Sequence, residues 1–160
     1  MSLQVFYQLL SAPPATLPDA VRAALPLGRP EACRYLAQSR CFGVKGRDDG
    51  SDFLVTARGV NDLFPRASER ARVWSTLAAV LLLGNVRFAD AADDGSSVID
   101  CEDEEMATTV AALLGLSGGA PELERAMCER RLTVRGQVRA FTACIHSVAM
   151  SDREASPGVA

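Results

Sequence analysis

The sequence predicts one mainly α-helical unit with a few short β-strands. Apolar residues fill 48% of the 160 positions, which is enough to build a hydrophobic core. They recur at helical spacing in several stretches, and proline or glycine ends most of these stretches. We find no internal repeat and no linker between two separate cores, so a single folded unit is expected.

Three helices are predicted in the first half of the chain, at residues 3–10, at 18–25 and between Ser51 and Pro65. Ser51 is expected to cap the third helix, and Pro65 is expected to end it. The segment 41–46 between the second and third helices is predicted to be irregular. The apolar residues at helical spacing are Phe6, Leu9 and Leu10 in the first helix, and Phe53, Val60, Leu63 and Phe64 in the third.

A longer helix is predicted to begin at a Ser68 cap and to end at Gly84. Gly84 is expected to adopt the left-handed conformation that often follows the last turn of a helix. The predicted buried stripe of this helix consists of Val73, Trp74, Leu77, Val80, Leu81 and Gly84.

The second half of the chain predicts short strands at 86–88 and 97–99, with an acidic loop at 90–95 between them. A helix capped by Asp100 and ended by Gly115 follows, with acidic residues in its first turn that suit the helix dipole. Pro121 opens another short helix, residues 132–138 predict a hairpin, and 139–150 could be helical. The apolar face of the helix after Asp100 consists of Met106, Val110, Leu113 and Leu114.

Composition excludes several classes of protein. The net charge of −3 gives no general attraction to nucleic acid, and no apolar stretch reaches the ~18 residues that a membrane span needs. The N-terminal apolar stretch is too short, and lacks the preceding positive charge, for a secretory signal. Five cysteines without a C-x-x-C pair fit neither a disulfide framework nor a zinc site, so we expect buried, reduced thiols in a cytosolic protein.

No residue pattern predicts catalysis. A phosphate-binding loop needs G-x-x-x-x-G-K-[ST], and the only lysine, Lys45, lacks that setting. The acidic residues at 93–103 do not follow calcium-loop spacing; we interpret them as solvated, with an incidental divalent-ion site as the alternative. Cys144 and His146 would face different sides of a helix. We therefore name no catalytic, cofactor-binding or metal-binding residue.

Arginines cluster near the predicted hairpin, opposed only by Glu129. A solvated loop and a docking surface for an acidic protein both fit this pattern, because desolvated arginines form charge-assisted bonds with carboxylates. A nucleic-acid surface fits less well, since few aromatic residues interleave with the cluster. The clustered residues are Arg125, Arg130, Arg131, Arg135 and Arg139.

Five segments, read in order, resemble the head domain of the myosin motors, over about residues 3–142. They are Val5-Phe6-Tyr7-Gln8-Leu9-Leu10, Tyr35-Leu36 through Cys41, Asp48-Asp49 with Phe53 and Thr56, Leu81-Leu82-Leu83-Gly84-Asn85-Val86-Arg87-Phe88, and Leu113-Leu114-Gly115-Leu116 with Leu123 and Arg131. The chain departs from the family at Leu82, where histidine is usual, and at Ser11 and Gly59. Residues 143–160 are expected to be a divergent, frayed tail.

The resemblance implies part of the upper 50-kDa region, a helical piece of this P-loop NTPase without its central nucleotide-binding sheet. The family's phosphate loop and first switch lie upstream of the matched segments, and its second switch lies downstream. No ATPase activity is therefore expected of the chain as it stands, and no cofactor bound by it. The complete family motor is an actin-activated ATPase that uses ATP and magnesium.

The resemblance also implies partners: an actin filament and the remainder of a myosin motor. Arg131 matches an arginine in a family loop that faces actin, whereas Arg135 and Arg139 are added to this candidate site on charge alone. A cytoplasmic location on the cytoskeleton is implied as well. The alternative is an autonomous helical adaptor that binds another acidic protein, and the sequence leaves that alternative open.

Overall fold

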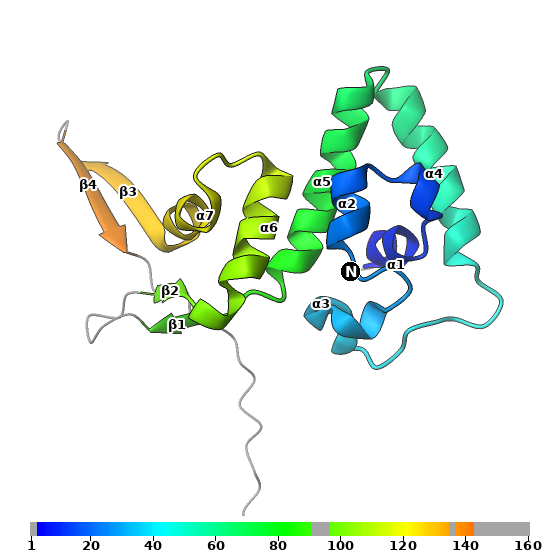
Figure 1. Ribbon diagram of the computed structural model, residues 1–160, viewed down its shortest axis with the longest axis horizontal. Coiled ribbons are helices and arrows are strands. Elements are labelled where there is room, and N and C mark those ends of the chain that lie inside the picture. Colours follow the sequence, from blue (N-terminus) through cyan, green and yellow to red (C-terminus); the bar gives the residue numbers. More distant parts are fainter. Residues whose placement is uncertain (1–2, 91–96, 135–136, 143–160) are drawn as a thin grey trace, which may run out of the picture.

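The computed structural model describes residues 3–90, 97–134 and 137–142 (Figure 1). The predicted mainly α-helical class with short strands is confirmed. The helices are α1 (Gln4–Leu10), α2 (Asp19–Ala24), α3 (Arg34–Ala37), α4 (Asp49–Leu63), α5 (Ala67–Leu83), α6 (Glu104–Leu114) and α7 (Gly119–Cys128). The 3-10 turns are η1 (Pro14–Thr16), η2 (Pro30–Ala32) and η3 (Cys101–Asp103), and the strands are β1 (Phe88–Asp90), β2 (Ser97–Ile99), β3 (Glu129–Val134) and β4 (Gln137–Thr142).

The hydrophobic core is organised around α5, which contacts α1, α2 and α6. Figure 1 shows α1–α4 on one side of α5 and α6, α7 and the β3–β4 hairpin on the other. Small side chains allow two helix backbones to approach closely. The buried alanines of this kind are Ala78 and Ala79 on α5 and Ala107 and Ala111 on α6.

Helix α4 is capped one turn earlier than the sequence predicted. The carboxylate of Asp48, not the hydroxyl of Ser51, accepts hydrogen bonds from the backbone N–H groups of Gly50 and Ser51. Ser51 lies in the first turn and donates its own hydroxyl to Asp48 at 2.6 Å. A carboxylate is the stronger acceptor at a helix N-terminus, where it also faces the positive end of the dipole.

The two long helices α4 and α5 run in opposite directions. An aromatic side chain from each helix meets the other near the core. Phe53 is buried, and its ring centroid lies 5.1 Å from that of Trp74 at a 43° tilt. The far end of α4 is different, because Leu63 is 75% exposed despite its predicted place in the apolar pattern. Arg70 closes this end by donating to the carbonyl oxygens of Phe64 and Pro65.

The predicted cap and stripe of α5 need correction. Arg66, rather than Ser68, is the N-cap residue, and its side chain makes no capping hydrogen bond. Val80 is exposed, while Leu82 is buried together with the alanines of the same face. Helix α5 packs against α1, α2 and α6, and its buried face includes the two alanines and leaves out Val80.

Gly84 does not adopt the predicted left-handed conformation. Its φ and ψ are −61° and −19°, which any residue can adopt. The glycine is needed for space instead, because a Cβ atom placed there would lie 2.5 Å from Cδ2 and Cε2 of Tyr35. Gly115, by contrast, ends α6 as predicted and is left-handed, at φ 76°.

The predicted cap of the next helix lies one 3-10 turn before the helix itself. Asp100 accepts a hydrogen bond from the N–H of Glu102 and thus caps η3, which runs directly into α6. Of the predicted apolar face, Val110 and Leu113 are buried, but Leu114 is 40% exposed. Ala107 and Ala111 are buried as well, although neither belonged to the predicted apolar face.

The strands form two separate antiparallel pairs. Strand β1 pairs with β2, aligning Phe88 with Ile99, and β3 pairs with β4, aligning Glu129 with Thr142. The second pair corrects the helix suggested at 139–150, since 139–142 belong to β4. Pairing with β3 satisfies the backbone of these residues along the ladder, which decides the conformation of a short segment over its helical propensity.

The thiols are only partly as predicted. Cys33 and Cys128 are buried, whereas Cys41 and Cys101 are exposed, and all four are free. Cys144 and His146, which were not expected to form a catalytic pair, lie outside the described residues, as do 143–160 generally. Within the described ranges, no helix combines the length and apolarity that crossing a bilayer requires.

Candidate functional site

The arginine hairpin, which we define as β3–β4 (residues 129–142), is the main candidate site. Helix α7 ends at Cys128 and β3 begins at Glu129, so no linker separates helix from strand. Figure 1 shows the hairpin at the end of the molecule farthest from α4. The sequence predicted this hairpin, and the ladder from Glu129–Thr142 to Val134–Gln137 confirms it.

The three predicted site residues do not occupy equivalent positions. Arg131 lies on β3 opposite Ala140, and Arg139 lies on β4 opposite Leu132. The two arginines therefore belong to successive pairs of the ladder, and successive pairs alternate between the two faces of a β-ribbon. Arg135, the third predicted residue, lies outside the described residues. The structure thus brings Arg131 and Arg139 onto one hairpin and leaves Arg135 a prediction.

Acidic residues accompany the arginines more closely than the sequence suggested. Arg125 is exposed on α7 and lines a hollow with Glu122, Ala126 and Glu129. Glu122 accepts a hydrogen bond from the N–H of Gly118 at 2.7 Å and so also caps the start of α7. The base of the hairpin therefore carries mixed charge, and Glu129 is not the sole acidic neighbour.

A carboxylate that sequence reasoning missed joins α7 to the first strand pair. Glu124 accepts a hydrogen bond from the backbone N–H of Ile99 at 2.8 Å. Ile99 is the last residue of β2, twenty-five positions earlier in the chain. No motif marks Glu124; its position one turn before the end of α7, next to a short strand, is the signal that could have found it.

The helix-to-strand corner after α5 is built from side-chain bonds to backbone. Asn85 accepts from the N–H of Arg34 at 2.8 Å and donates to the carbonyl of Ala32 at 3.0 Å. Arg87 extends this corner by binding Asp103 through both its backbone N–H and its Nε, each at 2.8 Å. The corner therefore has a structural role, which explains its motif without any ligand.

Charge pairing at this corner shifts two pKa values. The hydrogen bonds from Arg87 hold the pKa of Asp103 below its usual value of 3.8, against the opposing effect of burial. The same bonds, with those to Glu102, raise the pKa of Arg87. Both shifts favour the ion pair, and neither makes an acid or base suited to catalysis near neutral pH.

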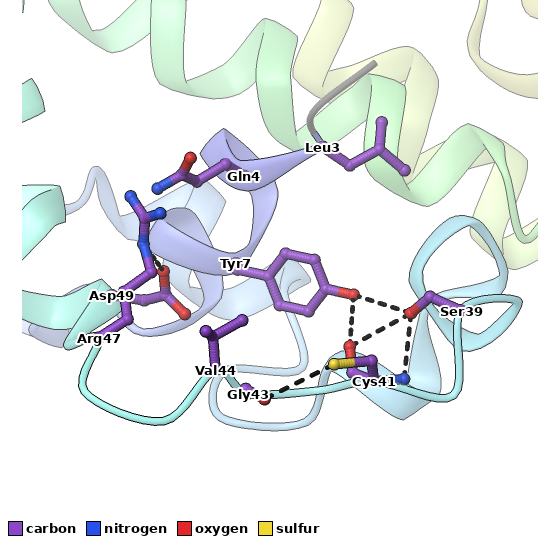
Figure 2. Close-up of a pocket in the computed structure, with 9 residues that line it drawn as sticks. All are labelled: Leu3, Gln4, Tyr7, Ser39, Cys41, Gly43, Val44, Arg47 and Asp49. Atoms are coloured by element: carbon purple, nitrogen blue, oxygen red, sulfur yellow. Dashed lines mark hydrogen bonds and ion pairs between the residues drawn. The ribbon is translucent and has the colours of Figure 1, made fainter.

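A pocket of about 230 Å³ beside α1 is an alternative site (Figure 2). The Tyr7 hydroxyl donates to the carbonyl of Cys41 at 3.1 Å and lies 3.2 Å from Ser39 Oγ, and the Cys41 thiol donates to Gly43. Because these groups bond one another, they hold the loop against α1 and form no nucleophile–base pair. The lining residues are Leu3, Gln4, Tyr7, Ser39, Cys41, Gly43, Val44, Arg47 and Asp49.

Metal binding finds no support in the part of the chain that is described. Among residues 3–90, 97–134 and 137–142, no three His, Cys, Asp or Glu side chains gather as ligands would. The acidic residues near Asp100 serve other purposes there, as a cap for η3 and as partners of Arg87.

Comparison with known proteins decides the family. The family model for the myosin head (motor domain) matches residues 2–156. The chain belongs to the myosin head family. The five short segments that resembled this family are therefore a correct indication, and the mainly helical fold fits a piece of such a motor.

Curated myosins from plants and fungi match most of this myosin chain. Myosin-17 of Arabidopsis thaliana is 33% identical over 133 residues, which is 83% of this chain and 8% of the relative. Myosin-7 of the same plant is 30% identical over 82% of this chain and 7% of its own length. Myosin-1 of Aspergillus fumigatus is 31% identical over 84% of this chain and 10% of its own length.

This myosin segment thus spans about a tenth or less of the relatives it matches. Its two candidate sites differ in what they offer. The α1 pocket presents side chains that already bond each other, whereas the arginine hairpin lies at one end of the molecule and its sequence is rich in arginine. The hairpin is therefore the better candidate for a partner.

Proposed function

We propose that this chain contributes a helical lobe to a myosin motor and that the arginine hairpin contacts the actin filament. One observation carries the proposal: a two-stranded arginine-rich ribbon continues directly from α7 at one end of the molecule. An arginine-bearing surface attracts acidic partners over a distance and binds carboxylates through paired N–H donors. Arg131 on β3 is the first residue proposed to act, followed by Arg139 on β4 and by Arg135, which lies between the two strands in the sequence.

The remainder of a motor domain is the second proposed partner. The longer relatives contain about ten times as many residues, so this lobe would pack on other parts of a motor. In such a motor, ATP and magnesium would be bound by those other parts. The location that follows is the cytoskeleton, within a myosin complex.

The chain alone is proposed not to hydrolyse ATP, because its sequence contains neither a phosphate loop nor a switch motif. A phosphate-release assay on the pure 160-residue chain, with magnesium and with or without actin filaments, tests this. Turnover above the background of a heat-denatured sample would refute it.

Filament binding is tested by co-sedimentation at low salt, where charge attraction is screened least. We expect the chain to pellet with actin filaments and Arg131→Glu to weaken pelleting. Arg58→Glu is the matched control, because Arg58 is exposed on α4 and far from the hairpin in Figure 1, yet the charge change is the same.

Two outcomes would count against the actin proposal. The chain could fail to pellet at any low salt concentration, or Arg131→Glu and Arg58→Glu could weaken pelleting equally. Failure to pellet, combined with Arg131-dependent binding to another acidic protein, would favour the alternative of an autonomous helical adaptor.

A further inference from the structure

No residue lies between helix α7 and the arginine hairpin. The backbone passes from helix to extended conformation at Glu129, with φ −99° and ψ 129°, and its N–H still bonds the carbonyl of Arg125. The preceding Cys128 is only 2% exposed, so the junction is anchored in packed surroundings. The direction of the hairpin therefore follows the direction of α7.

The side of α7 that faces β2 is not closely packed. A hollow of about 340 Å³ lies there, lined by both elements. Across it, the N–H of Ile99 donates a hydrogen bond to the Glu124 carboxylate and so links β2 to α7. The lining residues are Ser97, Val98, Pro121, Glu124, Arg125, Cys128 and Glu129.

The β2 end of this link is itself fixed. Strand β2 pairs with β1, and the N–H of Asp100, next to Ile99, bonds the carbonyl of Arg87. Arg87 in turn binds Asp103 and Glu102 at the start of α6. Ile99 thus offers its N–H from a position tied to two other elements, and Glu124 is the group on α7 that meets it.

We propose that Glu124 is a positioning residue that holds α7 on β2 and thereby sets the direction in which the arginine hairpin meets its acidic partner. The proposal rests on the proposed filament binding by the hairpin. Glu124 itself touches no partner. The negative charge of Glu124, taken alone, would weaken the attraction of the nearby basic surface to an acidic filament. Its positioning role has the opposite effect, because it strengthens binding.

Because the charge effect and the positioning effect of Glu124 act in opposite directions on binding, substitutions can distinguish them. Glu124→Ala removes a negative charge and also the acceptor, and we expect weaker pelleting by about three- to tenfold, the range for one lost hydrogen bond. Glu124→Gln removes the same charge but keeps an acceptor oxygen, so pelleting should be retained. Glu124→Asp keeps the charge but shortens the side chain, so it should weaken pelleting as the alanine variant does.

Glu105→Ala is the matched control. Glu105 is exposed in the first turn of α6, and its removal changes the net charge of the chain by the same amount. A general charge effect would make Glu105→Ala and Glu124→Ala behave alike, with equal or stronger pelleting in both. That result would overturn the proposal. Amide exchange at Ile99 reports the link directly and should accelerate in Glu124→Ala but not in Glu105→Ala.

A double variant separates this inference from the proposed function. If Glu124 acts through the hairpin, Glu124→Ala should cause no further loss of pelleting in an Arg131→Glu background. Equal additional loss in both backgrounds would overturn the positioning role. If Arg131→Glu weakens pelleting while Glu124→Ala does not, the inference fails and the filament proposal stands. If Arg131→Glu has no effect, both fail.

Discussion

The ring of Tyr35 packs directly over the Cα atom of Gly84, in the space that a Cβ atom would occupy. This contact joins α3 to the end of α5. Tyr35 remains 43% exposed, so one face of the ring packs while the other meets solvent. The glycine of the Leu-Gly-Asn segment therefore serves the close approach of a ring rather than a turn.

Gly84→Ala is expected to lower the free energy of unfolding by about 1–3 kcal/mol, because the added methyl group overlaps the Tyr35 ring. Gly59→Ala is the matched control, since no atom lies within 4 Å of its added Cβ and α4 continues through it. The control should raise the free energy of unfolding by about 0.5–1 kcal/mol. Urea titrations measure both. Loss of stability by Gly84→Ala that persists unchanged in a Tyr35→Ala background would contradict the explanation.

Phe53→Ala is expected to cost about 3–5 kcal/mol of unfolding free energy, because it empties a buried site beside Trp74. Phe64 follows the last residue of α4 and is 38% exposed, so Phe64→Ala should cost less than about 1 kcal/mol of unfolding free energy. Thermal or urea unfolding followed by circular dichroism compares the two. Similar costs would show that the end of α4 is buried in solution.

Stability should fall in acid partly through Asp103. Its folded-state pKa lies below its usual value of 3.8 because of Arg87, so its contribution is complete above that value and is lost as pH falls through the folded pKa. Asp103→Asn should therefore be less stable than the parent at pH 6, and the difference should shrink below pH ~3.5. Unfolding free energies across that range measure it; a difference that is constant with pH would count against the ion pair.

Thiol labelling should divide the described cysteines into two pairs. Cys41 and Cys101 are exposed and should react rapidly in the native protein. Burial raises the pKa of Cys33 and Cys128, with smaller contributions from the nearby Glu31 and Glu124, so both access and thiolate content are reduced. Peptide mapping after brief labelling tests this, with a urea-unfolded sample as the control. Fast labelling of Cys33 in native conditions would be inconsistent with its burial.

The sequence predicted an element well where interactions between near neighbours in the chain determine its conformation. The face of α1, the stop at Gly115 and the β3–β4 hairpin follow from spacing, backbone preference and turn chemistry, and all three are confirmed. The predictions were wrong where packing against a distant segment of the chain determines which residue is buried or required. The packed face of α5 includes Ala78 and Ala79 and leaves Val80 exposed, and Gly84 is needed because Tyr35 of α3 packs on it.

The candidate site likewise contains residues that the sequence predicted and residues that it did not. Arg131 was found from a motif, because its neighbourhood resembles one stretch of the family. Glu124 was not found, because its partner is the backbone of Ile99 and backbone groups leave no trace in side-chain patterns. The α1 pocket was missed for a related reason: Tyr7 and Cys41 come together across a loop whose path no local preference predicts.

The bonds of Asn85 have a consequence for the order of folding. They join positions 51 and 53 residues apart, across α3, α4, α5 and the intervening loops. Closing a loop of that length costs chain entropy before either bond can form, whereas α5 can form from contacts between near neighbours. We expect α5 to form first and to provide the surface on which the short α3 segment settles last. In the native protein, α3 would then be the first part of the N-terminal half to open.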